Sequence, residues 1–178
     1  MSRGHRRGKP LIVVIVVLLI VWPAYQIYAF LTPGVQKADA QRMLYEVSLF
    51  QMGIVNSSLN ESGHARVTKE LDSLKLAVYS AAYTHERLAK TVGGGRLQSL
   101  SSLNKMVEFI TALQIGGDRP VSDQERETLL SFQRQFGDML NAYGQLFSSG
   151  GQVVGSKNNT LTKTDADLAK LLEEQLSP

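Results

Sequence analysis

The 178-residue sequence predicts an all-α protein, in which a single N-terminal transmembrane helix is followed by an extracytoplasmic antiparallel four-helix bundle. The first observation behind this prediction is an almost unbroken apolar run from Leu11 to Leu31, directly after a basic stub. The second is that apolar residues beyond this run recur at alternating steps of four and three residues, which is the spacing of helices that pack together. The third is that no segment shows the alternating polar and apolar pattern of a half-buried strand.

The apolar run, residues 11–31, is long enough to serve as a membrane anchor. At about 1.5 Å per residue it forms a helix of roughly 30 Å, which matches the hydrocarbon thickness of a bilayer. Its aromatic residues lie in the C-terminal half, where such rings favour the headgroup layer. The residues assigned to this anchor are Leu11, Ile15, Leu18, Val21, Trp22, Tyr25 and Tyr28. The lipid bilayer is therefore the first expected partner.

Charge predicts the orientation of the anchor. The stub, residues 1–10, contains four basic residues and no acidic residue, whereas the opposite flank mixes Lys37, Asp39 and Arg42. An excess of positive charge marks the cytoplasmic side of a membrane protein. The sequence thus predicts a single-pass protein of the cell membrane, with its N-terminus in the cytoplasm and its C-terminal domain outside.

Cleavage of the apolar run as a signal peptide is the alternative to an anchor. The core of such a signal would extend from Leu11 to Val21, and small residues would have to precede the cut. The bulky Trp22 stands two positions before Ala24, which is unfavourable at a cleavage site. We therefore favour an uncleaved anchor.

The net charge of +3 and the isoelectric point near 9.2 come from the stub alone. Fifteen of the 19 basic residues lie beyond it, together with all 16 acidic residues, so residues 10–178 carry a formal charge of −1. This balance indicates no groove for a polyanion, and no nucleic acid partner is expected. The chain has no cysteine, so packing alone must stabilise the outer domain.

Residues 35–147 are predicted to form the bundle. The longest seam is interrupted by one polar residue, His85. Its members are Val67, Leu71, Leu74, Val78, Ala81, His85, Leu88 and Val92. A wide apolar face follows over residues 97–113. A shorter seam precedes the long one, at Met43, Val47, Phe50 and Ile54.

The last helix of the predicted bundle carries the candidate interaction face. Pro120 is followed by Ser122 and, three residues later, by Glu125, which is the pattern of a capping box at a helix start. The apolar face that follows consists of Leu129, Phe132, Phe136, Met139, Tyr143 and Leu146. We expect this face to be available to a partner protein.

Glycine-rich joints divide the helices. Residues 93–95 and 116–120 predict short turns, which make neighbouring helices antiparallel. Residues 148–163 are rich in Gly, Ser, Asn and Thr, which predicts a flexible linker. A short amphipathic helix is predicted over residues 165–176, with two aspartates in its first turn beside the positive end of the helix dipole. Residues 148–178 are therefore expected to be a linker and a tail helix outside the bundle.

No motif in the sequence predicts catalysis, a cofactor or a metal site. The segment that starts at His85 begins like the zinc motif HExxH, but Ala89 stands where the second histidine would be. Two roles remain open for His85: a hydrogen-bonded packing residue, which we favour, and a metal ligand or pH-sensing group. Tyr79, Tyr83 and Tyr143 are likewise favoured as packing residues over the lining of a ligand pocket. An enzyme is not expected, since no nucleophile, base and orienting group occur together.

The anchor, a first helix, a long second helix and then the segment SLSSLNKMVEFITALQIGGDRPVSDQERETLLSF resemble the N-terminal helical region of YpeB-type spore germination proteins. The resemblance covers residues 10–147. It rests on Leu100, Leu103, Phe109, Gly117, Asp118, Pro120, Glu125 and Leu129. It implies a spore-forming bacterium and a partner protein in the envelope. The chain ends without the PepSY-like repeats of that family, and no functional residue is carried over.

Two functions follow as expectations. The first is a membrane-anchored extracytoplasmic helical interaction protein that tethers or positions another envelope protein, in spore formation or germination if the resemblance holds. The alternative is a sensory or ligand-binding helical ectodomain. Because the cytoplasmic stub is too short for an output domain, a sensor of this kind needs a separate transducing partner. A homo-oligomer is compatible with either function.

Overall fold

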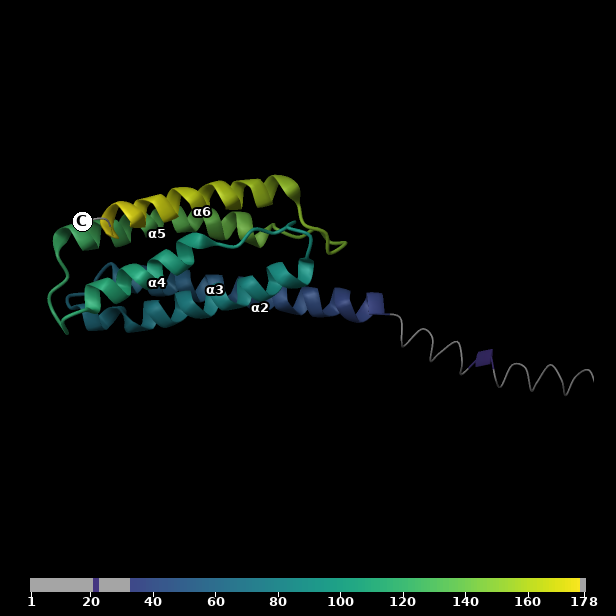
Figure 1. The fold of residues 1–178 in the computed structure, drawn as a ribbon, viewed down its shortest axis with the longest axis horizontal. Coiled ribbons are helices and arrows are strands. Elements are labelled where there is room, and N and C mark those ends of the chain that lie inside the picture. The colour runs from purple at the N-terminus through teal and green to yellow at the C-terminus, as the bar shows by residue number, and fades with distance from the viewer. Residues whose placement is uncertain (1–20, 23–32, 177–178) are drawn as a thin grey trace, which may run out of the picture. The chain divides into compact units, whose positions relative to one another are not determined.

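The computed structural model of the chain describes residues 21–22 and 33–176, and over these residues the protein is all-α (Figure 1). Residues 40–178 form one compact unit. Five α-helices are described: α2 (Pro33–Ser62), α3 (Asp72–Val92), α4 (Ser101–Gln114), α5 (Asp123–Gly144) and α6 (Gly155–Leu176). A 3-10 turn, η1 (Thr68–Leu71), leads into α3. The predicted helical bundle is confirmed.

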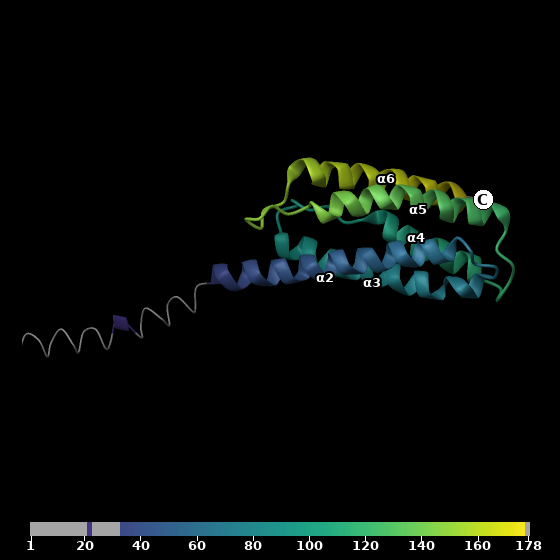
Figure 2. The ribbon, with the colours of Figure 1, turned by 180° about the vertical axis from the view of Figure 1, so that it is seen from behind.

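The helices of the compact unit lie lengthwise beside one another. Both views show α5 next to α6, with α4 between that pair and α3 (Figures 1 and 2). α6 packs against both α4 and α5, and α4 packs against α3. A single core of buried apolar side chains extends through all five helices. The bundle therefore contains one more helix than the four that the sequence predicts.

The predicted anchor lies almost entirely outside the described residues. This holds for Leu11, Ile15, Leu18, Tyr25 and Tyr28, while Val21 and Trp22 are described as helical. Among the helices of the described ranges, none has both the length and the apolar character needed to cross a bilayer. The transmembrane helix, its orientation and the cell-membrane location stay predictions.

α2 packs on the bundle with a different face from the one that the sequence predicts. Its buried residues include Ser48, Met52 and Val55. Met43 and Phe50, which belong to the predicted seam, are instead 66% and 67% exposed. The prediction of this seam was wrong because α2 carries two series of residues at coiled-coil spacing, and periodicity alone does not select the inner one.

α3 and the start of α5 follow the sequence closely. The buried residues of α3 are Leu74, Ala77, Val78, Ala81, His85, Leu88 and Val92, which confirms the long seam. The helix ends at a glycine run in which Gly93 has φ of 69°. At the start of α5, Ser122 Oγ accepts a hydrogen bond from the Glu125 backbone N–H, and the Glu125 carboxylate accepts one from the Ser122 N–H. The predicted capping box is therefore present.

The C-terminal segment differs from its prediction. α6 begins at Gly155, inside the predicted linker of residues 148–163, and it belongs to the bundle rather than to a separate tail. Leu161, Leu168 and Leu172 are fully buried. The reason is that tertiary packing of this apolar stripe outweighs the low helix propensity of the surrounding Asn, Ser and Thr residues.

A tight turn, not a flexible linker, connects α5 to α6. Phe147 and Val153 form an antiparallel bridge, and the Val154 N–H donates to the Leu146 carbonyl over 2.8 Å. Gly151 closes the turn with φ of 75°, a conformation that glycine adopts without strain. The glycine and serine residues that predict a flexible linker thus form a hydrogen-bonded turn in which the chain reverses direction.

Candidate functional site

The predicted interaction face on α5 lies in the core of the bundle. All of its members are buried: Leu129, Phe132, Phe136, Met139, Tyr143 and Leu146. Two of them, Phe132 and Phe136, stack with ring centroids 5.9 Å apart. The prediction that this face is available to a partner was wrong, because α6 completes the bundle around α5.

The polar residue of the long seam, His85, takes part in a buried line of hydrogen bonds. His85 is buried, with 1% of its surface exposed. His85 Nδ1 lies 2.9 Å from the Tyr143 hydroxyl, and Nε2 lies 2.7 Å from the Gln98 carbonyl oxygen. The Tyr143 hydroxyl also lies 2.6 Å from Ser48 Oγ. The line joins α2, α5 and α3 to the segment before α4.

Chemistry determines the direction of these hydrogen bonds. The Gln98 carbonyl can only accept, so Nε2 of His85 carries a proton. Burial lowers the pKa of His85, against the opposing effects of the Gln98 carbonyl and of Asp165, so the ring is neutral. Nδ1 of this neutral ring is therefore an acceptor, and the Tyr143 hydroxyl donates a hydrogen bond to it. The oxygen of the same hydroxyl then accepts a hydrogen bond from the Ser48 hydroxyl.

The buried line is a structural device rather than a reactive one. Ser48 and Tyr143 are both fully buried, so no substrate in solution reaches either hydroxyl. Burial also raises the pKa of the Tyr143 phenol, which keeps it a hydrogen-bond donor. Tyr45 adds a second contact, because its hydroxyl donates to the Tyr143 backbone carbonyl over 3.0 Å. Tyr143 is the residue on which these interactions converge.

Asp165, on α6, caps a different helix from the one that the sequence predicts. Its two carboxylate oxygens accept hydrogen bonds from the backbone N–H groups of Ser101 and Ser102, each over 2.9 Å. The hydroxyls of the same two serines donate to it as well. The carboxylate therefore lies at the positive end of the α4 dipole, where no side chain of the preceding residue caps the helix.

A pocket opens beside His85, on the surface between α3 and α4. Its volume is about 380 Å³. This α3–α4 pocket is lined by Tyr79, Ala82, Tyr83, His85, Glu86, Ser99, Leu100 and Asn104. The structure thus brings Tyr79 and Tyr83 together with His85, while Tyr143 lies on the inner side of the His85 ring.

Exposed apolar side chains extend along α3 next to this pocket. Leu76, Tyr79 and Tyr83 follow at steps of three and four residues and are 67%, 61% and 49% exposed. We call these three residues the α3 face. The Arg87 guanidinium lies over the Tyr83 ring, 4.7 Å from its centroid, and holds that ring at the surface. Tyr79 and Tyr83 therefore lie at the rim of the bundle and not in its core, with about half or more of each side chain exposed.

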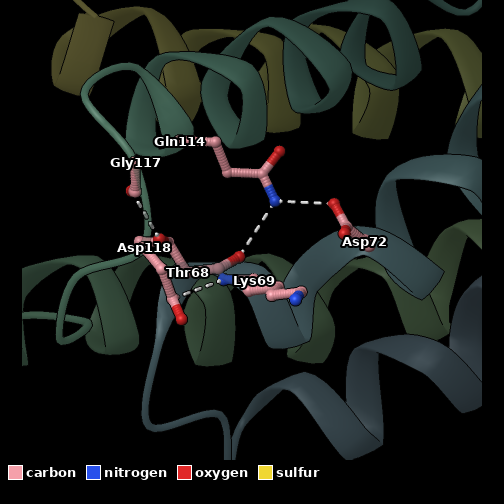
Figure 3. A pocket seen from close by; sticks show the side chains of 6 residues that line it. All are labelled: Thr68, Lys69, Asp72, Gln114, Gly117 and Asp118. Atoms are coloured by element: carbon pink, nitrogen blue, oxygen red, sulfur yellow. Dashed lines mark hydrogen bonds between the residues drawn. The ribbon is translucent and has the colours of Figure 1, made fainter.

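A second, shallower pocket of about 180 Å³ lies where η1 meets the end of α4 (Figure 3). Its polar groups are engaged with one another. Gln114 Nε2 donates to the Thr68 carbonyl and to the Asp72 carboxylate, both over 2.9 Å, and the Lys69 N–H donates to Asp118. These hydrogen bonds therefore connect η1 with the end of α4 and the loop after it, and they leave few of the pocket's polar groups free to bind a ligand.

The described residues contain no cluster of three or more His, Cys, Asp or Glu side chains able to hold a metal ion. No family model matches the chain, and neither a curated protein nor a solved structure matches it. The resemblance to YpeB-type spore germination proteins accordingly stays a prediction.

Proposed function

We propose that the chain is a membrane-anchored extracytoplasmic interaction protein that positions another envelope protein, which docks on the α3 face. The observation that carries this proposal is the exposure of Leu76, Tyr79 and Tyr83 next to the α3–α4 pocket. Tyrosine is enriched at protein interfaces because its ring offers apolar area and its hydroxyl a hydrogen bond. The apolar run and the basic stub support the membrane anchor.

The pocket supports a partner of particular chemistry. A well-bound partner segment inserts an apolar or aromatic side chain into a neighbouring pocket, and the surrounding contacts exclude water. The lining of the α3–α4 pocket includes the buried, apolar Leu100 and the exposed Ser99 and Asn104, whose polar groups are available for hydrogen bonds to a partner backbone. α3 is a rigid platform for such a contact, because its opposite face is buried in the core.

A photocrosslinking experiment tests the docking. The full-length chain carries benzoylphenylalanine in place of Tyr79 and is irradiated in intact membranes. We expect an adduct with one other envelope protein, and we expect the variant Tyr83→Ala to weaken it several-fold, since removal of a central aromatic residue costs about 1–2 kcal/mol of binding. The matched control carries the same group at Asp138, which is exposed on α5. Equal labelling from both positions, or none from position 79, would overturn the proposal.

A ligand-sensing ectodomain is the second candidate function, and one observation favours it. His85 lines the α3–α4 pocket and also contacts Tyr143, which in turn contacts Ser48 of α2. A small molecule in the pocket could thereby act on the helix that follows the apolar run. Ligand-observed NMR with a fragment library separates the two functions: specific fragment binding that Tyr83→Ala abolishes, without a protein adduct, supports the sensor.

A further inference from the structure

α2 carries two seams on nearly opposite sides. The inner seam consists of Tyr45, Ser48, Met52, Val55 and Leu59, which face the bundle. We call the other series the outer seam, and it consists of Ala40, Met43, Val47, Phe50 and Ile54. At about 100° per residue, the mean directions of the two seams lie roughly 140° apart. The packing of α2 on its own bundle therefore leaves four members of the outer seam exposed, while Ile54 packs against the edge of the core.

The outer seam is a large apolar surface in the compact unit. Met43 is 66% exposed, Val47 47% and Phe50 67%, while Ile54 is half-buried. Exposed apolar side chains that gather on one face of a helix are typical of interaction sites. The alternating steps of three and four residues specify a partner that is itself a helix, because only a helix presents side chains at the matching spacing.

The residue types along the outer seam fit a second copy of the same helix. Val47 and Ile54 are β-branched and occupy one of the two alternating positions, a choice that favours two-stranded parallel coiled coils. Met43 and Phe50 occupy the other position. In a parallel pair in register, Glu46 of one copy lies opposite Gln51 of the other, so a carboxylate meets an amide and no like charges oppose each other across this step.

The place of α2 in the chain supports the same occupant. The apolar run ends just before Pro33, so two copies anchored in one membrane both enter α2 from the membrane side, which permits a parallel pair. A seam of about two heptads is too short to associate strongly in dilute solution. Confinement to a membrane raises the effective concentration of the two helices, and the bundle already holds α2 helical, so little further ordering is needed.

We infer that the outer seam of α2 pairs with the outer seam of a second copy of the chain, as a parallel two-helix contact that presents two α3 faces at one membrane site. This inference rests on the proposed membrane anchor, but it is independent of which protein docks on the α3 face. A pair of copies gives a partner with two binding segments a bivalent site, whose avidity exceeds that of one face.

Cysteine crosslinking tests the pairing, because the natural chain has no cysteine and single substitutions report on single positions. The full-length variants Val47→Cys and Phe50→Cys are oxidised with copper phenanthroline in intact membranes. We expect each to form a disulfide-linked product of twice the 19.6 kDa chain mass. The control variant Arg42→Cys lies on an exposed part of α2 off the outer seam, and we expect it to react about tenfold more slowly.

Two further measurements separate the outcomes. In a parallel pair in register, position 47 of one copy lies opposite position 47 of the other. A mixture of the Val47→Cys and Phe50→Cys chains is therefore expected to give few disulfides that join position 47 to position 50. Abundant disulfides of this mixed kind indicate an antiparallel contact and overturn the inference. A second substitution, Val47→Glu in the Phe50→Cys chain, is expected to abolish the product while leaving the circular dichroism melt unchanged. Equal rates at positions 42 and 50, or no product from either seam variant, also overturn it. Crosslinking from Tyr79 is unaffected by these results, so failure here leaves the docking proposal standing.

Discussion

Tyr143 makes polar contacts with three residues of α2 and α3 that lie far from it in sequence. Its hydroxyl meets Ser48 and His85, and its backbone carbonyl accepts the Tyr45 hydroxyl. Sequence spacing places Tyr143 and His85 each on a seam, but Ser48 is 95 residues from Tyr143 and no local pattern pairs them. The packing role favoured for His85 is thus consistent with its two satisfied ring nitrogens, whereas the partners could be identified only from the folded chain.

Asp165 of α6 is expected to stabilise the start of another helix, α4. The variant Asp165→Asn keeps the shape of the side chain but replaces one accepting oxygen by a donor, which then faces a backbone N–H and a hydroxyl of the α4 start. We expect the free energy of unfolding to fall by about 2 kcal/mol. Urea denaturation of the full-length chain, followed by circular dichroism, measures the loss. Asp167→Asn is the control, because Asp167 is exposed on the same helix and should change stability little.

Acidification is expected to destabilise the bundle in two steps. Burial lowers the pKa of His85 below its usual 6.5, so the unfolded chain binds this proton more readily, and stability falls as the pH drops below 6.5. Hydrogen bonds from Arg119 lower the pKa of Glu125 from 4.5 to about 2. The contribution of Glu125 to the free energy of unfolding is therefore complete above pH 4.5 and is lost between pH 4.5 and 2. We expect it to be about 1 kcal/mol, because solvent screens the partly exposed Arg119.

Single substitutions distinguish the two steps. Urea midpoints measured as a function of pH should lose the lower step in Glu125→Gln and keep the upper one. His85→Gln should remove the upper step instead. A Glu125→Gln profile that matches the natural chain between pH 4.5 and 2 would show that the ion pair contributes nothing to stability.

At the scale of the elements, α6 gives the sharpest contrast with the sequence. Leu161 lies in the predicted linker yet is 1% exposed in the core. If this segment is a helix of the bundle, Leu161→Ala removes a packed side chain and leaves a cavity, which costs about 2–4 kcal/mol. The exposed Lys163→Ala on the same helix should be close to neutral. Thermal unfolding of both variants measures the difference, and equal melting temperatures would restore the flexible-linker prediction.

The helices of the bundle differ in how far their sequences determine their placement. α3 has one apolar seam, so its periodicity identifies the buried face directly. The start of α5 is marked by the capping box of Ser122 and Glu125, which forms within the helix itself and needs no contact with another helix. α2 has two seams of similar spacing. The outer one is wholly apolar, whereas the inner one contains the polar Ser48. Ser48 can be buried because Tyr143 satisfies it, and the sequence alone does not reveal this partner.

At the scale of the whole molecule, the sequence predicts the class of fold better than the surfaces that bear function. Helical periodicity reports which residues avoid water, and this was sufficient for a helical bundle. Exposed apolar side chains such as Tyr79 and Phe50 are exceptions to that pattern, and they become recognisable only when the core is seen to be complete without them. The interaction face assigned to α5 failed for the same reason, since a fifth helix was already there to cover it.

The cap that Asp165 provides has a consequence for the order of events during synthesis. The start of α4 is completed by a carboxylate that the ribosome adds 63 residues after Ser102. Until that late segment leaves the exit tunnel, two backbone amides and two hydroxyls at the α4 start lack their native acceptor. We therefore expect the bundle to stay incompletely assembled during synthesis until α6 is available to complete the start of α4.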